Sequence, residues 1–382
     1  MTRIAVAAIS ARMLAEAARA DGFEVAALDL FGDADTRRAA SQWAPIGAPG
    51  DLHVDGALLL AALQSAAQRF GAVGWVAGSG FEGRADLLEA GATLLPLLGN
   101  RGDAVRRVRD PAAFFGTLDA AGVAHPEVHF TARVDTANWL VKDPQGCGGW
   151  HIRRAGPDAD VVTPPRYFQR RMAGVPMSAT FLADGRRAHV LGFNELIVRA
   201  LGARPYVYCG AVGPVALAAG VARRVREAVS AVVAGFGLRG LGSLDFMLDA
   251  GAMGVLEVNP RPPASMALYA DRRFGGGAHG LFAAHVLACM HGELPEPAAP
   301  PAGDAVRGTE IVFAPRRLHL DEPTVRRLGQ RSGCHDLPAS ALDLAAGDPV
   351  CSVSALGTDT AQVRSQLDRG RDAVHHLLET SP

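Results

Sequence analysis

The chain has 382 residues, of which 49% are hydrophobic, so it is long enough for about two to three domains with apolar cores. Lys and Arg number 38 against 39 for Asp and Glu, and this balance gives no overall field favouring nucleic acid or an anionic membrane. Charged residues, Gly or Pro interrupt the longest apolar runs before the roughly 20 residues of a membrane helix. The 5 cysteines form no CxxC pair, which predicts a reducing, cytoplasmic location without structural zinc.

Residues 1 to about 100 alternate between short apolar strands and helices. Strands are predicted at residues 2–8, 23–32 and 71–83, with a helix reaching about residue 20. The alternation predicts parallel βαβ units, so we expect a small doubly wound α/β domain. No GxGxxG follows the first strand, so a dinucleotide fingerprint is absent. The turn GSGFEG at residues 78–83 either contacts a ligand or only turns the chain, and the sequence leaves both open.

The pattern changes after residue 100, where a basic amphipathic helix precedes Asp110. Asp110 is predicted to cap a second helix that has Pro111 in its first turn. Strands with an Asp-Gly turn at residues 184–185 follow, together with helices near 217–236 and 279–291. The stretch ELPEPAAPPAG is a predicted linker. Residues 305–382 then combine a few short strands with a final polar helix.

A predicted β-hairpin carries acidic residues on one face. Its strands are LGSLDFML and GVLEVN, joined by DAGAMG. A centre at Gly251 places Asp245 opposite Glu257 and Ser243 opposite Asn259. Strict alternation then gives one polar face, and assigns Leu256 to the core on the other. The members of the polar face are Ser243, Asp245, Met247, Val255, Glu257 and Asn259.

Asp245 and Glu257 are therefore expected about 4.5–5.5 Å apart between Cβ atoms. Like charges at this distance need a cation, a shared proton or full solvation, and an exposed hairpin with ordinary solvated acids is the simpler alternative. Asn259 adds an oxygen ligand, and an all-oxygen set completed by substrate phosphates suits Mg²⁺. Arg261 has the same parity, and a guanidinium beside a metal suits a phosphoryl group in transfer.

A second candidate phosphate-binding element follows the apolar strand that ends in Lys142. The sequence VKDPQGCGGWHI places Gly146, Gly148 and Gly149 directly after this lysine. Backbone N–H groups of such a loop can surround phosphate oxygens while the lysine neutralises them. No GK[ST] follows, so the loop is not a Walker A sequence. A simple Gly-rich turn is the alternative interpretation.

Three segments resemble the core of the ATP-grasp superfamily, over about residues 100–290. They are WLVKDPQGCGGWHI, YFQRRMAGVPMSATFLADG and GSLDFMLDAGAMGVLEVNPRPPAS. The resemblance implies mixed α/β and α+β architecture. Residues 1–100 would be a doubly wound pre-ATP-grasp domain, 101–295 a two-subdomain ATP-grasp domain, and 305–382 a small, mostly β C-terminal domain.

The resemblance also implies roles for individual residues. Lys142 would contact the ATP phosphates under a loop containing Gly146, Gly148 and Gly149. An interdomain segment with Gln169, Arg170 and Arg171 would read adenine. Asp245, Glu257 and Asn259 would hold one or two Mg²⁺ ions, or Mn²⁺ in their place. Arg261 would stabilise the transferring phosphate.

The sequence departs from the family pattern at three places. FQRRM lacks the usual acid of the adenine segment, and GVPMS replaces the acid that often binds ribose. The basic residue before the first core helix has no single match among Arg101, Arg106, Arg107 and Arg109.

Within the superfamily, GSGFE and EVNPRP are similar to bacterial carboligase-like proteins related to biotin carboxylase. Some of these are associated with methanopterin- or methanofuran-type one-carbon cofactor pathways. The resemblance implies an ATP-dependent carboxylate–amine ligase that forms a C–N bond through an acyl phosphate on small molecules. Alternatives are a carboxylase that activates bicarbonate, although no biotin-carrier motif is present, and a non-catalytic nucleotide-binding protein. Neither nucleic acid nor membrane partners are expected, and a homodimer is left open.

Further side chains near these motifs have two interpretations each. Cys147 is interpreted as a small buried residue rather than a nucleophile, and His151 as local support rather than a base. Tyr206, Tyr208 and the segment from Ser265 to Arg272 either line an acceptor pocket or only pack. The sequence does not choose between these.

Overall fold

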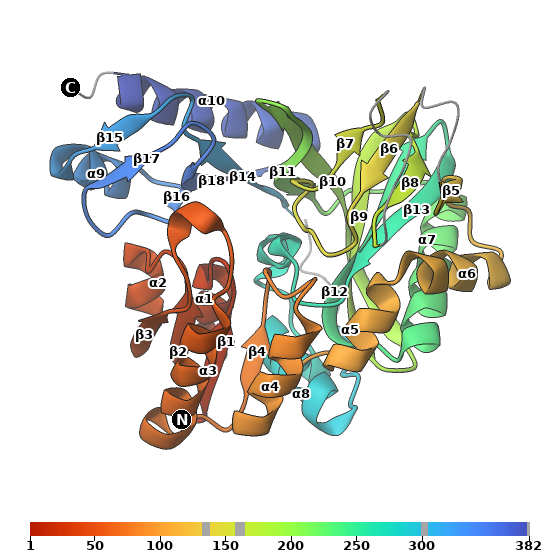
Figure 1. The fold of residues 1–382 in the computed structure, drawn as a ribbon, viewed down its shortest axis with the longest axis horizontal. Helices are drawn as coiled ribbons and strands as arrows, with labels where there is room; N and C mark the ends of the chain where they lie inside the picture. The colour runs from red at the N-terminus through yellow and green to blue at the C-terminus, as the bar shows by residue number, and fades with distance from the viewer. Residues whose placement is uncertain (132–137, 157–164, 299–304, 380–382) are drawn as a thin grey trace.

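The computed structural model describes residues 1–131, 138–156, 165–298 and 305–379. The N-terminal part of the chain forms a four-stranded sheet in the order β3-β2-β1-β4 (Figure 1). All of its pairings are parallel, as predicted. The elements in chain order are β1 (Arg3–Ala7), α1 (Arg12–Ala20), β2 (Glu24–Asp29), α2 (Ala34–Ala39), β3 (Gln42–Pro45), α3 (Gly56–Ser65), β4 (Trp75–Ala77) and α4 (Ala85–Leu94).

The central strands of this sheet are buried on both faces, which explains their continuous apolar sequence. One face of β1 and β2 packs against α1 and α8, while the other packs against α3 and α4. Loops after β1, β2 and β4 therefore emerge together at one edge of the sheet. In open α/β sheets this carboxyl edge is where ligands bind.

Two helices and a small antiparallel sheet come next. The helices are α5 (Gly102–Arg109) and α6 (Pro111–Ala120), and the Asp110 carboxylate caps α6 by accepting from the Ala113 N–H, as predicted. The small sheet has the order β5-β8-β6-β7. Its strands are β5 (Val128–His129), β6 (Trp139–Lys142), β7 (Arg153–Arg154) and β8 (Tyr167–Arg170).

An eight-stranded antiparallel sheet forms the largest layer, in the order β13-β12-β9-β10-β11-β14-β18-β16. Helix α7 packs with Phe181 and Phe246 on one face, and α8 packs with Leu182 and Leu241 on the other. The elements are β9 (Val175–Asp184), β10 (Ala188–Leu201), β11 (Arg204–Gly213), α7 (Ala219–Phe236), β12 (Arg239–Asp249), β13 (Ala252–Asn259) and α8 (Leu281–His291).

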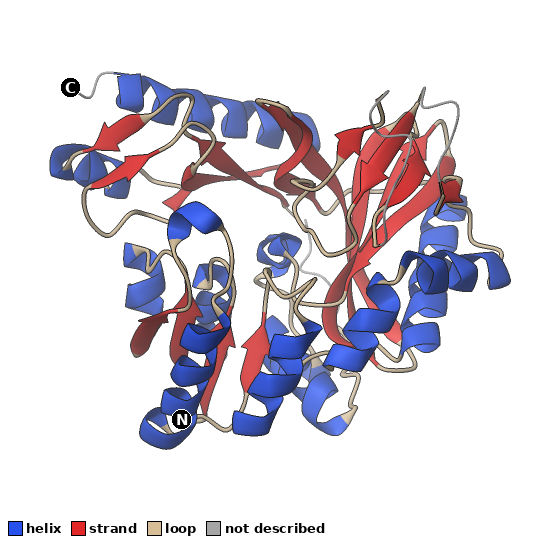
Figure 2. Cartoon of the chain, viewed as in Figure 1, coloured by secondary structure: helices blue, strands red, loops and turns tan. Residues whose placement is uncertain are grey.

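The C-terminal strands extend this same large sheet. Strand β14 pairs with β11, and β18 pairs with β14, while α10 lies across both (Figure 2). The elements are β14 (Val306–Phe313), β15 (Leu318–Leu320), α9 (Glu322–Gly329), β16 (Cys334–His335), β17 (Leu342–Leu344), β18 (Pro349–Gly357) and α10 (Thr360–Glu379). The domain boundaries stay a prediction, and residues 299–303 of the predicted linker lie outside the described residues.

Short helical turns complete the described chain. The 3₁₀ turns are Pro49–Asp51, Ala264–Tyr269 and Gly275–Gly277, and a π turn follows α3 at Ala66–Phe70. No helix in the described ranges is long and apolar enough to cross a membrane. The 5 cysteines are all free thiols.

The hairpin of β12 and β13 has the predicted register around its acids, with Asp245 opposite Glu257 and Ser243 opposite Asn259. Nearer the turn the prediction is wrong. Phe246 pairs with Val255, so Leu256 is an extra residue in a β-bulge. The bulge reverses two side chains relative to strict alternation: Val255 is fully buried in the core, and Leu256 lines a cleft.

We expect Gly210→Ala to separate β11 from β14. A Cβ at residue 210 would lie 2.0 Å from the backbone oxygen of Thr309. A backbone atom in a paired strand cannot move away as easily as the end of a flexible side chain. The free energy of unfolding should fall by about 1–3 kcal/mol, as overpacking does in well-packed interiors. Urea unfolding measures this. Gly116→Ala is the control, because nothing lies within 4 Å of its Cβ position; equal stability of both variants would contradict the prediction.

Candidate active site

A large cleft opens between the N-terminal sheet, the small sheet and the large sheet, with a volume of about 2370 Å³. It is lined by the loops after β1, β2 and β4, by the glycine loop after β6, and by the polar face of β12 and β13. Pockets for one small ligand usually have about 300–1,000 Å³. The cleft therefore has room for more than one ligand of that size.

The two hairpin acids face this cleft. Asp245 and Glu257 are direct cross-strand partners. Burial and the charge of Glu257 raise the pKa of Asp245 above its usual range. Burial alone would also raise the pKa of Glu257, but Lys142 and Arg109 outweigh it and lower that pKa. The pair thus has one strongly ionised carboxylate and one that needs further positive charge to ionise.

Lys142 supplies part of that positive charge from the end of β6. Its side chain is buried, and its Nζ lies 3.6 Å from Glu257 Oε2. Burial tends to lower the pKa of Lys142, yet Tyr167 and Glu257 raise it overall, so the ammonium form persists. The sequence analysis placed Lys142 at the phosphates of a nucleotide, and the structure shows its ammonium beside Glu257.

Arg261 is fixed by a residue that the sequence analysis did not single out. Its Nε donates to Glu82 Oε1 at 2.7 Å, and Glu82 Oε2 accepts from the Gly80 N–H at 2.8 Å. Burial would raise the pKa of Glu82, but Arg261 and Arg109 lower it. The turn at residues 78–83 therefore carries the carboxylate that orients Arg261.

Asn100 holds the backbone next to Arg261 in place. Its amide nitrogen donates to the backbone oxygens of Arg239 and Pro260, at 3.0 and 2.9 Å, and its oxygen accepts from the Arg239 N–H. One side chain thus joins the beginning of β12 to the end of β13.

Among the basic candidates before the first core helix, Arg109 is the one at the glycine loop. Its guanidinium donates to the backbone oxygens of Pro144 and Gly146, at 2.7 and 2.6 Å. Gly149 has a φ of 75°, and a Cβ there would lie 1.8 Å from the Tyr206 oxygen. Glycine is therefore required where the loop crosses β11.

Neither Cys147 nor His151 has the properties of a reacting group here. Burial raises the pKa of the Cys147 thiol to about 12, which disfavours the nucleophilic thiolate. Burial lowers the pKa of His151 to about 4, so the ring is neutral. Both observations agree with the supporting roles expected from the sequence.

Several buried polar atoms in the cleft have no hydrogen-bond partner within the part of the chain that the structure describes. These atoms are Gln169 Nε2 and the hydroxyls of Tyr206 and Tyr208, and all three residues line the cleft. Buried polar atoms in proteins nearly always have hydrogen-bond partners. A polar ligand would supply partners for these atoms, which favours the acceptor-pocket interpretation of both tyrosines.

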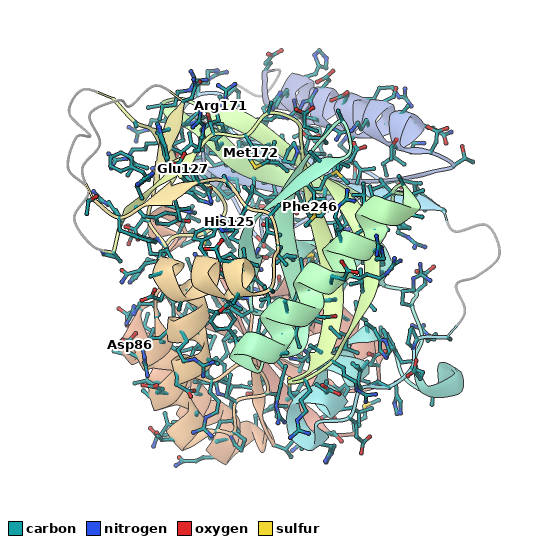
Figure 3. The ribbon with its side chains drawn as sticks, turned by 90° about the vertical axis from the view of Figure 1, so that its right-hand side faces the viewer. Asp86, His125, Glu127, Arg171, Met172 and Phe246 are labelled. Carbon is teal, nitrogen blue, oxygen red and sulfur yellow. The ribbon has the colours of Figure 1, made fainter. Side chains whose placement is uncertain are left out.

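The predicted adenine segment connects β8 of the small sheet to β9 of the large one. Figure 3 shows Arg171 and Met172 together in this connection, with Glu127 nearby. Arg170 is exposed and its Nη1 lies 3.3 Å from Glu127 Oε2, while the Arg171 N–H donates to the Asn138 oxygen. Gln169, Arg170 and Arg171 all line the cleft.

Ser265 belongs to a buried hydrogen-bond network beneath the cleft floor. Its hydroxyl lies 2.7 Å from that of Thr180, and Asn194 donates to Thr180 and to Ser178. The Tyr269 hydroxyl donates to the Asn194 oxygen at 2.5 Å. The segment after β13 is thus held against β9 and β10, and the packing interpretation fits Ser265.

The donor set suits a hard divalent ion shared with phosphates. Asp245 and Glu257 provide oxygens on one wall, although Asn259 now turns its amide nitrogen to Asp245 at 3.1 Å and its oxygen to Arg261 at 3.4 Å. To act as an oxygen ligand, that amide would have to reorient. Across the described ranges, no group of three or more His, Cys, Asp or Glu residues is arranged to hold a metal. Phosphate oxygens would complete the coordination.

The central part of the chain also matches a known protein family. Residues 108–265 match the family model described as ATP-grasp domain. This segment is therefore similar to ATP-grasp domains. The matched residues begin beside Arg109 and end at Ser265, so they include the glycine loop and the whole polar hairpin.

Solved structures share the fold over nearly the whole chain. Biotin carboxylase from Campylobacter jejuni has a TM-score of 0.68 at 12% identity, covering 96% of this chain and 89% of its own. L-amino acid ligase from Bacillus licheniformis has 0.68 at 14%, covering 97% of both. N5-carboxyaminoimidazole synthetase from Staphylococcus aureus has 0.64 at 15%, covering 99% and 97%. The ATP-grasp fold with its flanking regions is therefore common to all three.

Curated relatives match part of the chain at higher sequence identity than these structures. The carbamoyl phosphate synthase large chains of Renibacterium salmoninarum and Kocuria rhizophila are 28% and 29% identical over 197 and 200 residues. Each match covers 46% of this chain and 18% of the relative. The matched stretch thus spans about a fifth of those relatives.

We expect Glu82→Gln to destabilise the protein by about 3–5 kcal/mol at neutral pH, because Arg261 loses its buried anionic partner. Since the folded-state pKa of Glu82 is lowered, this stabilisation exists above its unfolded pKa and disappears as the pH falls through the folded pKa. Denaturant unfolding at neutral and strongly acidic pH measures the change. Glu89→Gln, at an exposed Arg106 pair, is the control and should alter stability little; identical unfolding of both variants would refute the prediction.

Arg109→Met should weaken binding of an ATP analogue with Mg²⁺ by about tenfold or more, equivalent to about 1.4 kcal/mol. The ATP-grasp glycine loop would lose both hydrogen bonds that hold Pro144 and Gly146. Calorimetric titration measures the affinity. Arg107→Met removes an exposed guanidinium from the same helix, where it contacts only the Gly235 oxygen and the Phe236 ring. If both variants lost the same affinity for the ATP analogue, the loss would come from overall charge, and the predicted role of Arg109 would be wrong.

Proposed function

We propose that the protein is an ATP-dependent ligase that joins a small-molecule carboxylate to an amine through a C–N bond. The observation that carries this proposal is the opposed Asp245–Glu257 pair with Lys142 and Arg261 in the same cleft. Such a cluster suits phosphoryl transfer, in which positioned charges stabilise a developing anion. Binding of a nucleotide alone does not require this many opposed charges in one place, which favours an enzyme over a non-catalytic nucleotide-binding protein.

The proposed reaction has two steps. A carboxylate oxygen of the substrate attacks the γ-phosphorus of ATP, and the bond to ADP breaks to give an acyl phosphate. The amine nitrogen then attacks the carbonyl carbon, phosphate leaves, and the nitrogen loses a proton. No protein nucleophile is needed, in agreement with the raised pKa of Cys147. Positioning of the reactants accounts for much of the expected acceleration.

Individual residues have distinct proposed roles in these steps. Lys142 and the N–H groups of the loop with Gly146, Gly148 and Gly149 bind phosphate oxygens, and Arg109 keeps the loop in place. Arg261, oriented by Glu82, stabilises charge on the transferred phosphoryl group and then on the carbonyl oxygen. Asp245, Glu257 and Asn259 would hold Mg²⁺, which neutralises phosphate charge when bound.

The nucleoside end of ATP is proposed to occupy the cleft beside the β8–β9 connection. Gln169, Arg170 and Arg171 lie there, and the unpartnered amide nitrogen of Gln169 is suited to a ring nitrogen or hydroxyl oxygen. Leu256 and Met247 line the same cleft and offer apolar surface. The cleft-lining residues of GVPMS are Gly174, Pro176 and Ser178, so this stretch offers no acid where one often binds ribose in the family.

The named activities of the structural neighbours support both C–N ligation and carboxylation. L-amino acid ligase and N5-carboxyaminoimidazole synthetase share the fold, and so do biotin carboxylases. The carboxylase function is therefore the second candidate, with bicarbonate as the activated acid. The one-carbon cofactor pathway, the cytoplasmic location and a homodimer stay predictions from the sequence.

A labelled-oxygen assay distinguishes these functions. The purified chain is incubated with ATP, Mg²⁺ and a panel of ¹⁸O-labelled carboxylates with amines, and ADP and phosphate are measured. Transfer of one labelled oxygen to phosphate, dependent on acid and amine, supports the ligase. Label transfer from bicarbonate alone supports the carboxylase. ATP binding without turnover under all conditions would refute both.

Glu257→Gln should lower nucleotide-dependent turnover by roughly 100-fold or more, because it removes a charge needed where phosphate charge develops. Its unfolding temperature should stay close to wild type, since Asp245 still compensates Lys142. Asp249→Asn changes an exposed acid at the end of β12 of the same hairpin and should retain full turnover. Full activity of the Glu257 variant would overturn the metal-site assignment.

A further inference from the structure

A buried carboxylate in the lining of the cleft has no partner among the residues that the structure describes. Asp33 lies between β2 and α2, is only 6% exposed, and lines the cleft. Its side chain accepts no cap hydrogen bond from α2, and within the described ranges it makes no other hydrogen bond or ion pair. Neither the acyl-transfer chemistry nor nucleotide binding uses it.

The neighbouring acids differ from Asp33 because protein groups satisfy each of them. Asp29 accepts from two backbone N–H groups and the Trp43 ring N–H. Asp35 accepts from the backbone N–H groups of residues 336 and 337. Asp336 accepts from the side chains of Arg12, Ser10 and Ser352. Asp336 also lines the cleft, but among these four acids only the Asp33 carboxylate accepts no hydrogen bond from the described residues.

The nearby cations are already engaged elsewhere. Arg12 binds Asp336 at 2.8 Å and Glu16 at 2.7 Å. Arg37 donates to the Gly32 oxygen and stacks on the Trp43 ring, with its guanidinium carbon 4.0 Å from the ring centroid. Arg84 pairs with Asp86. Among the described residues none of these cations forms an ion pair with Asp33, and the charge of Arg12 offsets only part of the repulsion from the neighbouring acids.

This environment raises the pKa of Asp33 to about 8, through burial first and then through the charges of Asp336, Asp29 and Asp35. A bound cation would reverse the effect and ionise the group. A metal ion is not the expected occupant, since no metal-holding group of three or more such side chains exists among the described residues. An organic cation needs only one ionised carboxylate.

The position of Asp33 relative to the reacting centre limits the shape of such a cation. Asp33 follows β2 and Glu82 follows β4, with β1 between these strands. Two strand spacings separate the loops by roughly 10 Å. Glu82 in turn contacts Arg261, so Asp33 lies well away from the proposed site of bond formation.

The surface between the two loops includes apolar side chains, although Ser10 and Arg12 line the cleft there as well. Ile9 and Met13, from the loop and helix after β1, line the cleft. Ile9 lies between the other two loops, because its N–H donates to the Ser79 oxygen and its oxygen accepts from the Leu30 N–H. An aliphatic stem fits this position, with polar groups only at its ends.

We propose that Asp33 binds an ammonium group at the end of a substrate remote from the bond being formed, with an aliphatic stem over Ile9. The identification of this occupant as a ligase substrate rests on the proposed function. The ammonium belongs either to the amine substrate, then a diamine, or to the carboxylate substrate, then an ω-amino acid. Both share the same recognition chemistry.

Two pairs of probes test the site and distinguish the sources. Cadaverine is compared with n-pentylamine, and ε-aminocaproate with caproate, because each pair differs by one terminal ammonium group. Binding to the full chain with a non-hydrolysable ATP analogue and Mg²⁺ is measured by saturation-transfer NMR. The wild type should prefer the ammonium-bearing member of one pair by about tenfold, and the preferred pair identifies the substrate class.

Asp33→Asn should abolish this preference, whereas Asp33→Glu should retain it. Asp51→Asn is the matched control, because Asp51 is exposed and lines the same cleft. The unfolding temperature of Asp33→Asn should equal or exceed that of wild type, since a charge-repelled side chain is neutralised. Absence of preference in the wild type, or its persistence in Asp33→Asn, would overturn the inference. Binding needs no turnover, so either result leaves the ligase proposal to its own test.

Discussion

The arrangement of the cleft depends on two carboxylates that lie opposite each other on adjacent strands. Asp245 and Glu257 face each other in a cleft wall, and such a pair is destabilising unless positive charge surrounds it. Lys142 from the small sheet and Arg261 from the end of the hairpin provide that charge. The small sheet contributes Lys142, the N-terminal sheet contributes the Glu82 carboxylate that holds Arg261, and the hairpin contributes both acids.

The N-terminal sheet takes part in the site through its carboxyl edge. Glu82 fixes Arg261, and Asn100 fixes the backbone on either side of the hairpin. Farther along the same edge, the Asp33 carboxylate has no hydrogen bond or ion pair among the described residues. Neighbouring loops of one parallel sheet thus differ, since one holds Arg261 through Glu82 and the other places an unpaired carboxylate in the cleft.

Sequence reasoning was most successful where the physics is local. Period-2 alternation and a short turn gave the Asp245–Glu257 pairing correctly, and helix caps such as Asp110 depend on neighbouring residues. The bulge at Leu256 was missed because nothing within the strand marks an extra residue. Glu82 and the joining of β14 to β11 could not be predicted, since both depend on contacts between distant segments. Among the four arginines considered, only the folded chain showed that Arg109 reaches the loop.

The Glu82–Arg261 pair also determines how far the chain can be shortened. The segment 108–265 that matches the family model contains Arg261 but excludes Glu82 and Asn100. Expressed alone, this segment would contain Arg261 without the Glu82 carboxylate that pairs with it. It would also lack Asn100, which joins the two strands of the hairpin. The segment that matches the family model is therefore shorter than the part of the chain that holds Arg261 and the hairpin in place.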